Sequence, residues 1–179
     1  MKELFVFDLD STMINTMLPE PGKKIWLEKT GSPWAHRGWW GRSESLDTEI
    51  FEHPRNEWVF EQYKKACGIE GAYKIILTGR VKNLLGKVNE LLHHNDITEM
   101  DEILCNGHFG KVTRTEWFKI EALVKYIKEH GDTLERIVIY DDREEHIPIF
   151  KKWAQETQKR TGIKIVVDKI VDGVGRYEI

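Results

Sequence analysis

Two aspartates, Asp8 and Asp10, directly follow an apolar run near the start of the chain. At the end of a strand, this spacing lets both carboxylates converge on one ligand. Neighbouring carboxylates repel each other, and a bound cation or a raised pKa on one of them relieves the repulsion. One carboxylate could then act as a nucleophile that also holds the cation, while the other transfers a proton. A loop with acidic capping residues is the simpler alternative.

Polar residues also follow two later apolar runs. Thr78, Gly79 and Arg80 offer a hydroxyl, close backbone approach and a guanidinium fork, all of which suit a phosphate group. The alternative for this tripeptide is a helix N-terminus with a surface arginine. Asp141 and Asp142 end another run, and their hard carboxylate oxygens suit Mg²⁺. One of the two could instead cap the following helix, and the sequence does not decide which.

A site for a phosphoryl group also needs a cation that offsets the charge on its oxygens. Lys119 and Lys111 are the candidates. Lys119 is preferred because it lies near the start of the helix expected before the Asp141–Asp142 strand, so its ammonium group could reach the same sheet edge. Solvation on the helix surface is the alternative.

The elements that must position these residues follow from the apolar pattern. Buried strands are expected at residues 4–7, 73–77, 101–105, 137–140 and 163–167, separated by segments with helical spacing. Asn56 and a Thr113–Glu116 capping box are the predicted helix starts. This alternation predicts an α/β fold: a doubly wound three-layer sandwich with a central parallel sheet, which binds ligands beyond the carboxyl ends of its strands.

One segment, residues 14–55, interrupts this pattern and is predicted to be a cap-like insertion in a single domain spanning residues 1–179. It holds four of the seven tryptophans. Trp39 and Trp40 alternate with Arg37 and Arg42, a composition that suits stacking on bases and pairing with backbone phosphates. The alternative is that the tryptophans pack the insertion onto the core.

Composition limits the class of protein. The 179 residues are 40% hydrophobic and 32% charged, with a net charge of −3, so a protein that coats nucleic acid nonspecifically is not expected. No apolar run is long enough to span a membrane, and no signal peptide is evident. Two cysteines, Cys67 and Cys105, are too few for a disulfide framework. A cytoplasmic protein with free thiols is predicted.

Together, four motifs resemble those of the haloacid dehalogenase (HAD) superfamily of phosphatases. They are DLDST at 8–12, ILTGR at 76–80, Lys119 and IYDDR at 139–143. The sequence segments at 32–46, 56–63 and 140–150 are similar to the HAD domain of Swiss Army Knife RNA-repair proteins. The combination of a Thr-Gly-Arg motif with an Asp-Asp-Arg motif is similar to that of the phosphatase half of polynucleotide kinase-phosphatases.

The resemblance implies specific roles for these residues. Asp8 would be the nucleophile and Asp10 the general acid–base, with Thr78 and Lys119 assisting at the phosphoryl group. Mg²⁺ would be held by Asp8, the backbone carbonyl of Asp10 and one of Asp141 and Asp142.

The expected reaction is Mg²⁺-dependent removal of terminal 3′-phosphates from nucleic acid through an aspartyl-phosphate. An RNA-repair ligase or kinase is the expected partner. Two alternatives stay open at this point. One is a phosphatase of nucleotides or another small metabolite, and the other is a non-catalytic module that binds nucleic-acid ends.

Overall fold

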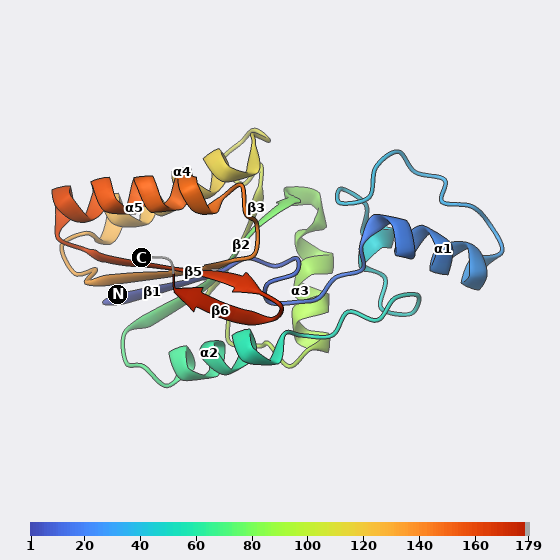
Figure 1. Ribbon diagram of the computed structural model, residues 1–179, viewed down its shortest axis with the longest axis horizontal. Helices are drawn as coiled ribbons and strands as arrows, with labels where there is room; N and C mark the ends of the chain where they lie inside the picture. Colours follow the sequence, from blue (N-terminus) through green and yellow to red (C-terminus); the bar gives the residue numbers. More distant parts are fainter. Residues whose placement is uncertain (178–179) are drawn as a thin grey trace.

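The computed structural model describes residues 1–177, whose strands form one six-stranded sheet. The sheet order is β3-β2-β1-β4-β5-β6. The strands are β1 (Glu3–Phe7), β2 (Ala72–Val81), β3 (Glu102–Asn106), β4 (Arg136–Asp141), β5 (Lys164–Val171) and β6 (Val174–Tyr177). Strands β1 to β5 are parallel, and β6 pairs with β5 antiparallel (Figure 1). The predicted α/β class and central parallel sheet are confirmed.

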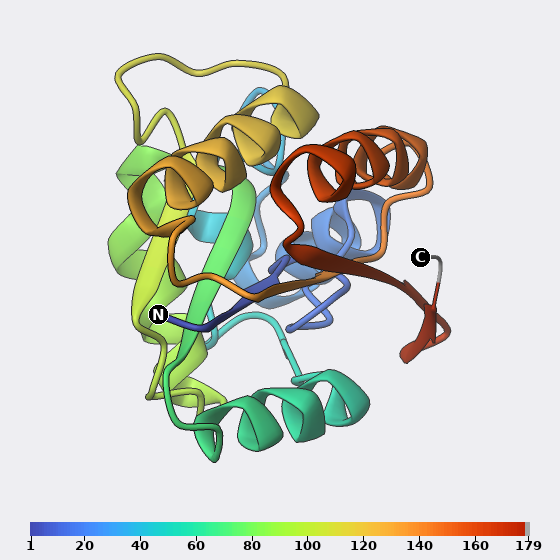
Figure 2. The same ribbon diagram turned by 90° about the vertical axis from the view of Figure 1, so that its left-hand side faces the viewer.

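Helices cover both faces of the sheet, as Figure 2 shows. Helices α2 (Glu57–Cys67) and α3 (Leu85–His94) pack on one face, and α4 (Thr115–His130) and α5 (Ile147–Thr161) pack on the other. Side chains alternate along β1, so Phe5 and Phe7 enter the first core while Leu4 and Val6 enter the second. This burial on both faces explains why the strands read as continuous apolar runs.

The segment between β1 and α2 contains helix α1 (Pro19–Thr30) and the short 3₁₀ helix η1 (Ser43–Leu46). In Figure 1, α1 lies apart from the sheet, beyond α3. The two ends of the segment meet, because Ile14 forms a bridge with Arg55 and the Asn15 backbone N–H donates to the Pro54 carbonyl at 2.8 Å. The segment between β1 and α2 therefore leaves and re-enters the main fold at one place.

Several local predictions are corrected by the structure. Helix α1 was not expected, and the last predicted strand is followed by another, the antiparallel β6. The predicted Thr113–Glu116 capping box is wrong: Arg114 is the N-cap residue and makes no capping side-chain hydrogen bond. Asn56 is confirmed as an N-cap, since its side chain accepts from the Trp58 and Val59 backbone N–H groups.

Candidate active site

Three strands that carry candidate residues, β2, β1 and β4, are neighbours in the sheet. Phe7 at the end of β1 is level with Ile76 of β2 and Tyr140 of β4. The next residue, Asp8, keeps this register because its backbone N–H donates to the Tyr140 carbonyl at 3.0 Å. The chain passes from β1 to β2 and β3 on one side and then crosses to β4 on the other side of β1. The candidate residues therefore meet at the switch point of the sheet.

A tight turn follows Asp8 and brings Thr12 back toward the carboxylates at the end of the sheet. The Met13 backbone N–H returns to the Asp8 carbonyl at 3.2 Å, and Ser11 adopts a left-handed backbone with φ of 58°. Non-glycine residues seldom adopt this conformation. The turn places the Thr12 hydroxyl against Asp142, to which it donates at 3.2 Å.

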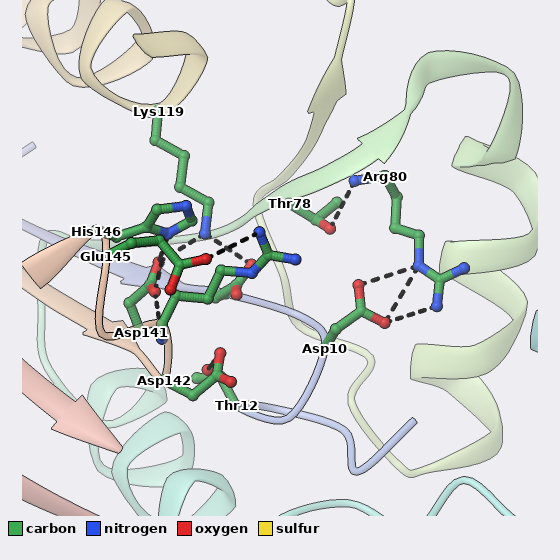
Figure 3. Close-up of polar contacts among 11 residues, drawn as sticks. Asp10, Thr12, Thr78, Arg80, Lys119, Asp141, Asp142, Glu145 and His146 are labelled. Atoms are coloured by element: carbon green, nitrogen blue, oxygen red, sulfur yellow. Dashed lines mark hydrogen bonds and ion pairs between the residues drawn. The ribbon is translucent and has the colours of Figure 1, made fainter. Parts of the chain in front are cut away.

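Lys119 projects from α4 into the carboxylates at the sheet edge (Figure 3). Its Nζ lies 2.8 Å from Asp8 Oδ1 and 2.6 Å from Asp141 Oδ2. Burial alone would lower the pKa of Lys119, but Asp141 and Asp8 together raise it, so the buried ammonium stays charged. Lys111, the other candidate, is exposed in the loop before α4.

Asp141 is the most extensively paired carboxylate of the site. Besides Lys119, it accepts from the Arg143 backbone N–H at 3.0 Å and contacts His146 Nδ1 at 3.1 Å. Since a carboxylate can only accept, the imidazole donates from Nδ1. Burial would raise the pKa of Asp141, but Lys119 and His146 hold it at about 2, so this carboxylate is ionised.

Asp8 lies in a strongly negative environment. Oxygens of Asp8, Asp141 and Asp142 lie within 4.8 Å of one another. Burial, opposed by Lys119 but reinforced by Asp141 and Asp142, raises the pKa of Asp8 to about 8. Burial and Asp141 also raise the pKa of Asp142. Three clustered hard oxygen donors with excess negative charge fit a divalent cation such as Mg²⁺.

Asp10 points away from this cluster and pairs with Arg80 instead (Figure 3). Arg80 Nη2 donates to Asp10 Oδ1 at 2.7 Å, and Nε donates to Asp10 Oδ2 at 3.0 Å. The Thr16 hydroxyl donates to the same carboxylate at 2.7 Å. The arrangement fixes the carboxylate by four donated hydrogen bonds from two side chains.

Thr78 lies three residues before the end of β2 and is fully buried, and its hydroxyl oxygen accepts from the Arg80 backbone N–H at 3.1 Å. A pocket of about 180 Å³ opens between the two groups of acids. Its lining comprises Asp8, Asp10, Trp40, Gly79, Arg80, Thr115 and Arg143. The volume suits a small group such as a phosphoryl group rather than a whole nucleotide.

Some residues predicted to bind substrate lie away from this pocket. Trp39 is only 3% exposed and packs in an aromatic cluster of the insertion, with its Nε1 donating to the Met17 carbonyl. Arg37 and Arg42 are exposed, and the Arg42 guanidinium donates to the Arg37 carbonyl. The prediction that Trp39 contacts substrate is therefore wrong, because packing occupies its ring. Trp40, in contrast, lines the pocket.

Other residues of the site were not predicted from the sequence. They are Thr12, Thr16, Ser45, Thr115 and His146. One sequence feature could have indicated His146, because it lies five residues after Asp141, directly before helix α5. The others are small hydroxyl residues of ordinary appearance, and only the folded chain brings them to the acids.

The comparison with known families agrees with this geometry. Residues 19–174 match the HAD domain family 1 in Swiss Army Knife RNA repair proteins. The chain belongs to this family. The resemblance inferred from its motifs is thereby confirmed, and the protein is a phosphatase of the HAD type.

A solved structure supports the same fold. CbbY from Rhodobacter sphaeroides, crystallised in complex with phosphate, superposes with a TM-score of 0.55 at 13% identity. The alignment covers 100% of this chain and 90% of CbbY. No curated protein gives a significant match. Within residues 1–177, no helix is long and apolar enough to cross a membrane.

Proposed function

We propose that this HAD-type phosphatase is Mg²⁺-dependent and uses Asp8 to form an aspartyl-phosphate. The observation that carries the proposal is the position of Asp8, within 2.8 Å of the Lys119 ammonium and at the wall of the pocket. A carboxylate beside a fixed cation meets the requirement for attack on a phosphoryl group whose oxygens carry negative charge.

Mg²⁺ would be held by Asp8, Asp142 and Asp141, together with the backbone carbonyl of Asp10. When bound, it would neutralise the acids and the charge of the phosphoryl oxygens. Asp142 has fewer competing contacts than Asp141, which already accepts from Lys119, His146 and the Arg143 backbone. Asp142 is therefore the better candidate for direct coordination, and Asp141 for holding Lys119 in place.

The reaction has two steps. An Asp8 oxygen bonds to phosphorus while the ester P–O bond breaks, and Asp10 delivers a proton to the departing alkoxide. A water molecule then attacks the phosphorus of the aspartyl-phosphate, Asp10 takes its proton, and phosphate leaves with Asp8 restored. Lys119 balances the charge of the phosphoryl oxygens, and the Thr78 hydroxyl donates to one of them.

The substrate we propose is a terminal 3′-phosphate of nucleic acid, released during end processing in RNA repair. The family description supports this class, and so does the half-buried Trp40 at the pocket wall, on which a terminal base would stack. A small pocket accepts the phosphate while the rest of a strand stays outside. An RNA-repair ligase or kinase would be the partner, and the cytoplasm the expected compartment.

A phosphatase of nucleotides or another small metabolite is the second candidate, because a pocket of about 180 Å³ that holds only the phosphoryl group would accept that group from any such ester. The non-catalytic binding module does not agree with the assignment of the chain to HAD-type phosphatases.

Steady-state kinetics on three phosphate esters would separate the two candidates. The substrates are a 3′-phosphorylated oligonucleotide, the matching 3′-mononucleotide and p-nitrophenyl phosphate, each with Mg²⁺ and with EDTA. End processing predicts that kcat/KM for the oligonucleotide exceeds that for the mononucleotide by about tenfold or more, from stacking beyond the phosphate. Equal values would contradict end processing, and activity in EDTA would contradict the Mg²⁺ requirement.

A further inference from the structure

Arg80 is a buried charge whose guanidinium binds groups of the protein itself. Its side chain has no exposed surface, and it ranks among the largest fully buried side chains of the described chain. The Thr-Gly-Arg motif suggested a fork for the substrate phosphate. The structure instead directs this fork to Asp10, the proposed acid–base (Figure 3).

Every nitrogen of the guanidinium already donates a hydrogen bond. Nε and Nη2 bind the Asp10 carboxylate from the side. Nη1 donates to Ser45 Oγ at 2.7 Å and to the Trp40 carbonyl at 3.0 Å. A bidentate bond to phosphate would require at least one of these contacts to break, since the fork is planar and rigid.

The same guanidinium connects Asp10 with the insertion. Ser45 belongs to η1 and is fully buried, while Trp40 precedes η1 and lines the pocket. The Arg80 guanidinium carbon also lies 5.0 Å from the centre of the Trp40 ring. One side chain of β2 thus fixes both the carboxylate proposed to move the proton and the wall of the pocket beside it.

We infer that Arg80 is a positioning residue, which orients the Asp10 carboxylate and ties it to the 40–45 segment, and not a phosphate ligand. The inference rests on the proposed function, because it takes Asp10 as the acid–base. Its consequence is specific: loss of Arg80 impairs proton delivery to the leaving oxygen more than it impairs phosphate binding.

The leaving group provides the test. An alkoxide needs a proton as it departs, whereas p-nitrophenolate departs readily without one, so only the alkyl ester depends strongly on general acid catalysis. We would measure kcat/KM for β-glycerophosphate and for p-nitrophenyl phosphate in Arg80→Lys, which keeps the charge and loses the fork. Arg136→Lys, which changes an arginine at the opposite end of the sheet, is the matched control.

Arg80→Lys is expected to lower the β-glycerophosphate value by about 100-fold, within the range for general acid catalysis, and the p-nitrophenyl phosphate value by less than about fivefold. Ser45→Ala removes a single hydrogen bond of Nη1. It should lower the ratio of kcat/KM for β-glycerophosphate to kcat/KM for p-nitrophenyl phosphate in the same direction, by a smaller factor. Arg136→Lys should leave the ratio unchanged. Should Arg80→Lys fail to fold, Ser45→Ala carries the test.

A double variant that combines Arg80→Lys with Asp10→Asn shows whether Arg80 acts through Asp10 or independently of it. If Arg80 works by positioning Asp10, the double variant has the same substrate ratio as Asp10→Asn alone. Equal losses on both substrates, a rise in KM with unchanged kcat, or multiplicative losses in the double variant would each overturn the inference. Full activity of Asp8→Asn would instead overturn the proposed function, so the two failures are distinguishable.

Discussion

Asp8, the proposed nucleophile, lowers the stability of the folded protein at neutral pH. Its pKa is about 8 in the folded protein, against an ordinary value of 3.8, because it is buried beside Asp141 and Asp142. Between these two pH values the unfolded chain releases the proton and the folded chain retains it. The free energy of unfolding therefore falls as the pH rises from about 4 to about 8.

Replacement of Asp8 by asparagine should remove this cost. In metal-free protein we expect Asp8→Asn to be more stable than the wild type by about 1–3 kcal/mol at pH 8, because no charge is buried, and equally stable at pH 4. Urea denaturation in EDTA at the two pH values measures the difference. Lower stability of the variant at pH 8 would contradict the unfavourable burial of the Asp8 charge beside the other acids.

Mg²⁺ binding should depend on the same proton. The cation must displace the proton from Asp8 below pH 8, so its affinity should rise toward that pH by up to about tenfold per pH unit. Calorimetric titrations in buffers of different ionisation enthalpy count the protons released. Asp142→Asn, which removes a charged group proposed as a ligand, should weaken binding strongly, and a pH-independent affinity would argue against Asp8 as a ligand.

At the scale of elements, the end of β2 and the start of α4 are in very close contact. A Cβ atom added to Gly79 would lie 2.8 Å from both Oγ1 and Cγ2 of Thr115, the first residue of α4. Because Lys119 lies one turn further along this helix, the contact also sets the distance between the ammonium and Asp8. The glycine of the Thr-Gly-Arg motif thus has a packing role.

Gly79→Ala should push α4 away from the sheet edge. We expect a loss of about 1–3 kcal/mol in stability from overpacking and a roughly 10- to 100-fold lower kcat from misplacement of Lys119. Thr115→Ala in the same chain removes the two clashing atoms and should restore most of both losses. If the double variant is no better than Gly79→Ala, the explanation through this contact is wrong.

Strands and helices with a clear buried face were the elements that the sequence allowed us to predict. Helix α1 was missed because it buries only Gly22 on one side, so no apolar stripe marks it. Strand β6 was missed because it is an edge strand of largely exposed residues. The helix start at Arg114 lacks a side-chain cap, so no local signal could locate it.

At the scale of the whole molecule, the insertion has a small aromatic core of its own next to the pocket. Rings of Trp26, Trp34, Trp39 and Phe51 pack against one another with centroids 4.6–6.5 Å apart. Two ring atoms of Trp39 also lie 2.3 and 2.5 Å from the position that a Cβ on Gly22 would take, too close for any side chain there. Of the two adjacent tryptophans, one therefore holds the insertion together and the other faces the pocket.

The two tryptophans should respond differently to truncation. Trp39→Ala is expected to cost about 3–5 kcal/mol, measured as a loss of stability in denaturation, because it empties the aromatic cluster. Trp40→Ala retains the backbone carbonyl that Arg80 contacts, and should lower kcat/KM for a 3′-phosphorylated oligonucleotide about tenfold through lost stacking. Its effect on p-nitrophenyl phosphate should be small, and an equal loss on both substrates would exclude stacking.

The strand ends could be assigned from the sequence because apolar runs and terminal acids are local signals. The pairing of Arg80 with Asp10, across 70 positions of the chain, depends on the order of strands and on the path of the insertion. Neither is visible in the spacing of residues. The same is true of Trp39 and Trp40, whose opposite environments follow from packing around Gly22 and Arg80.

In the proposed mechanism, Asp8 becomes phosphorylated during turnover. The most direct measurement is to quench the enzyme during Mg²⁺-dependent turnover, reduce it with borohydride and map the peptides by mass spectrometry. An aspartyl-phosphate at Asp8 predicts homoserine at position 8, dependent on substrate and absent from the Asp10 position. Continued turnover with reduction at a different residue, or undiminished turnover by Asp8→Asn, would contradict this mechanism.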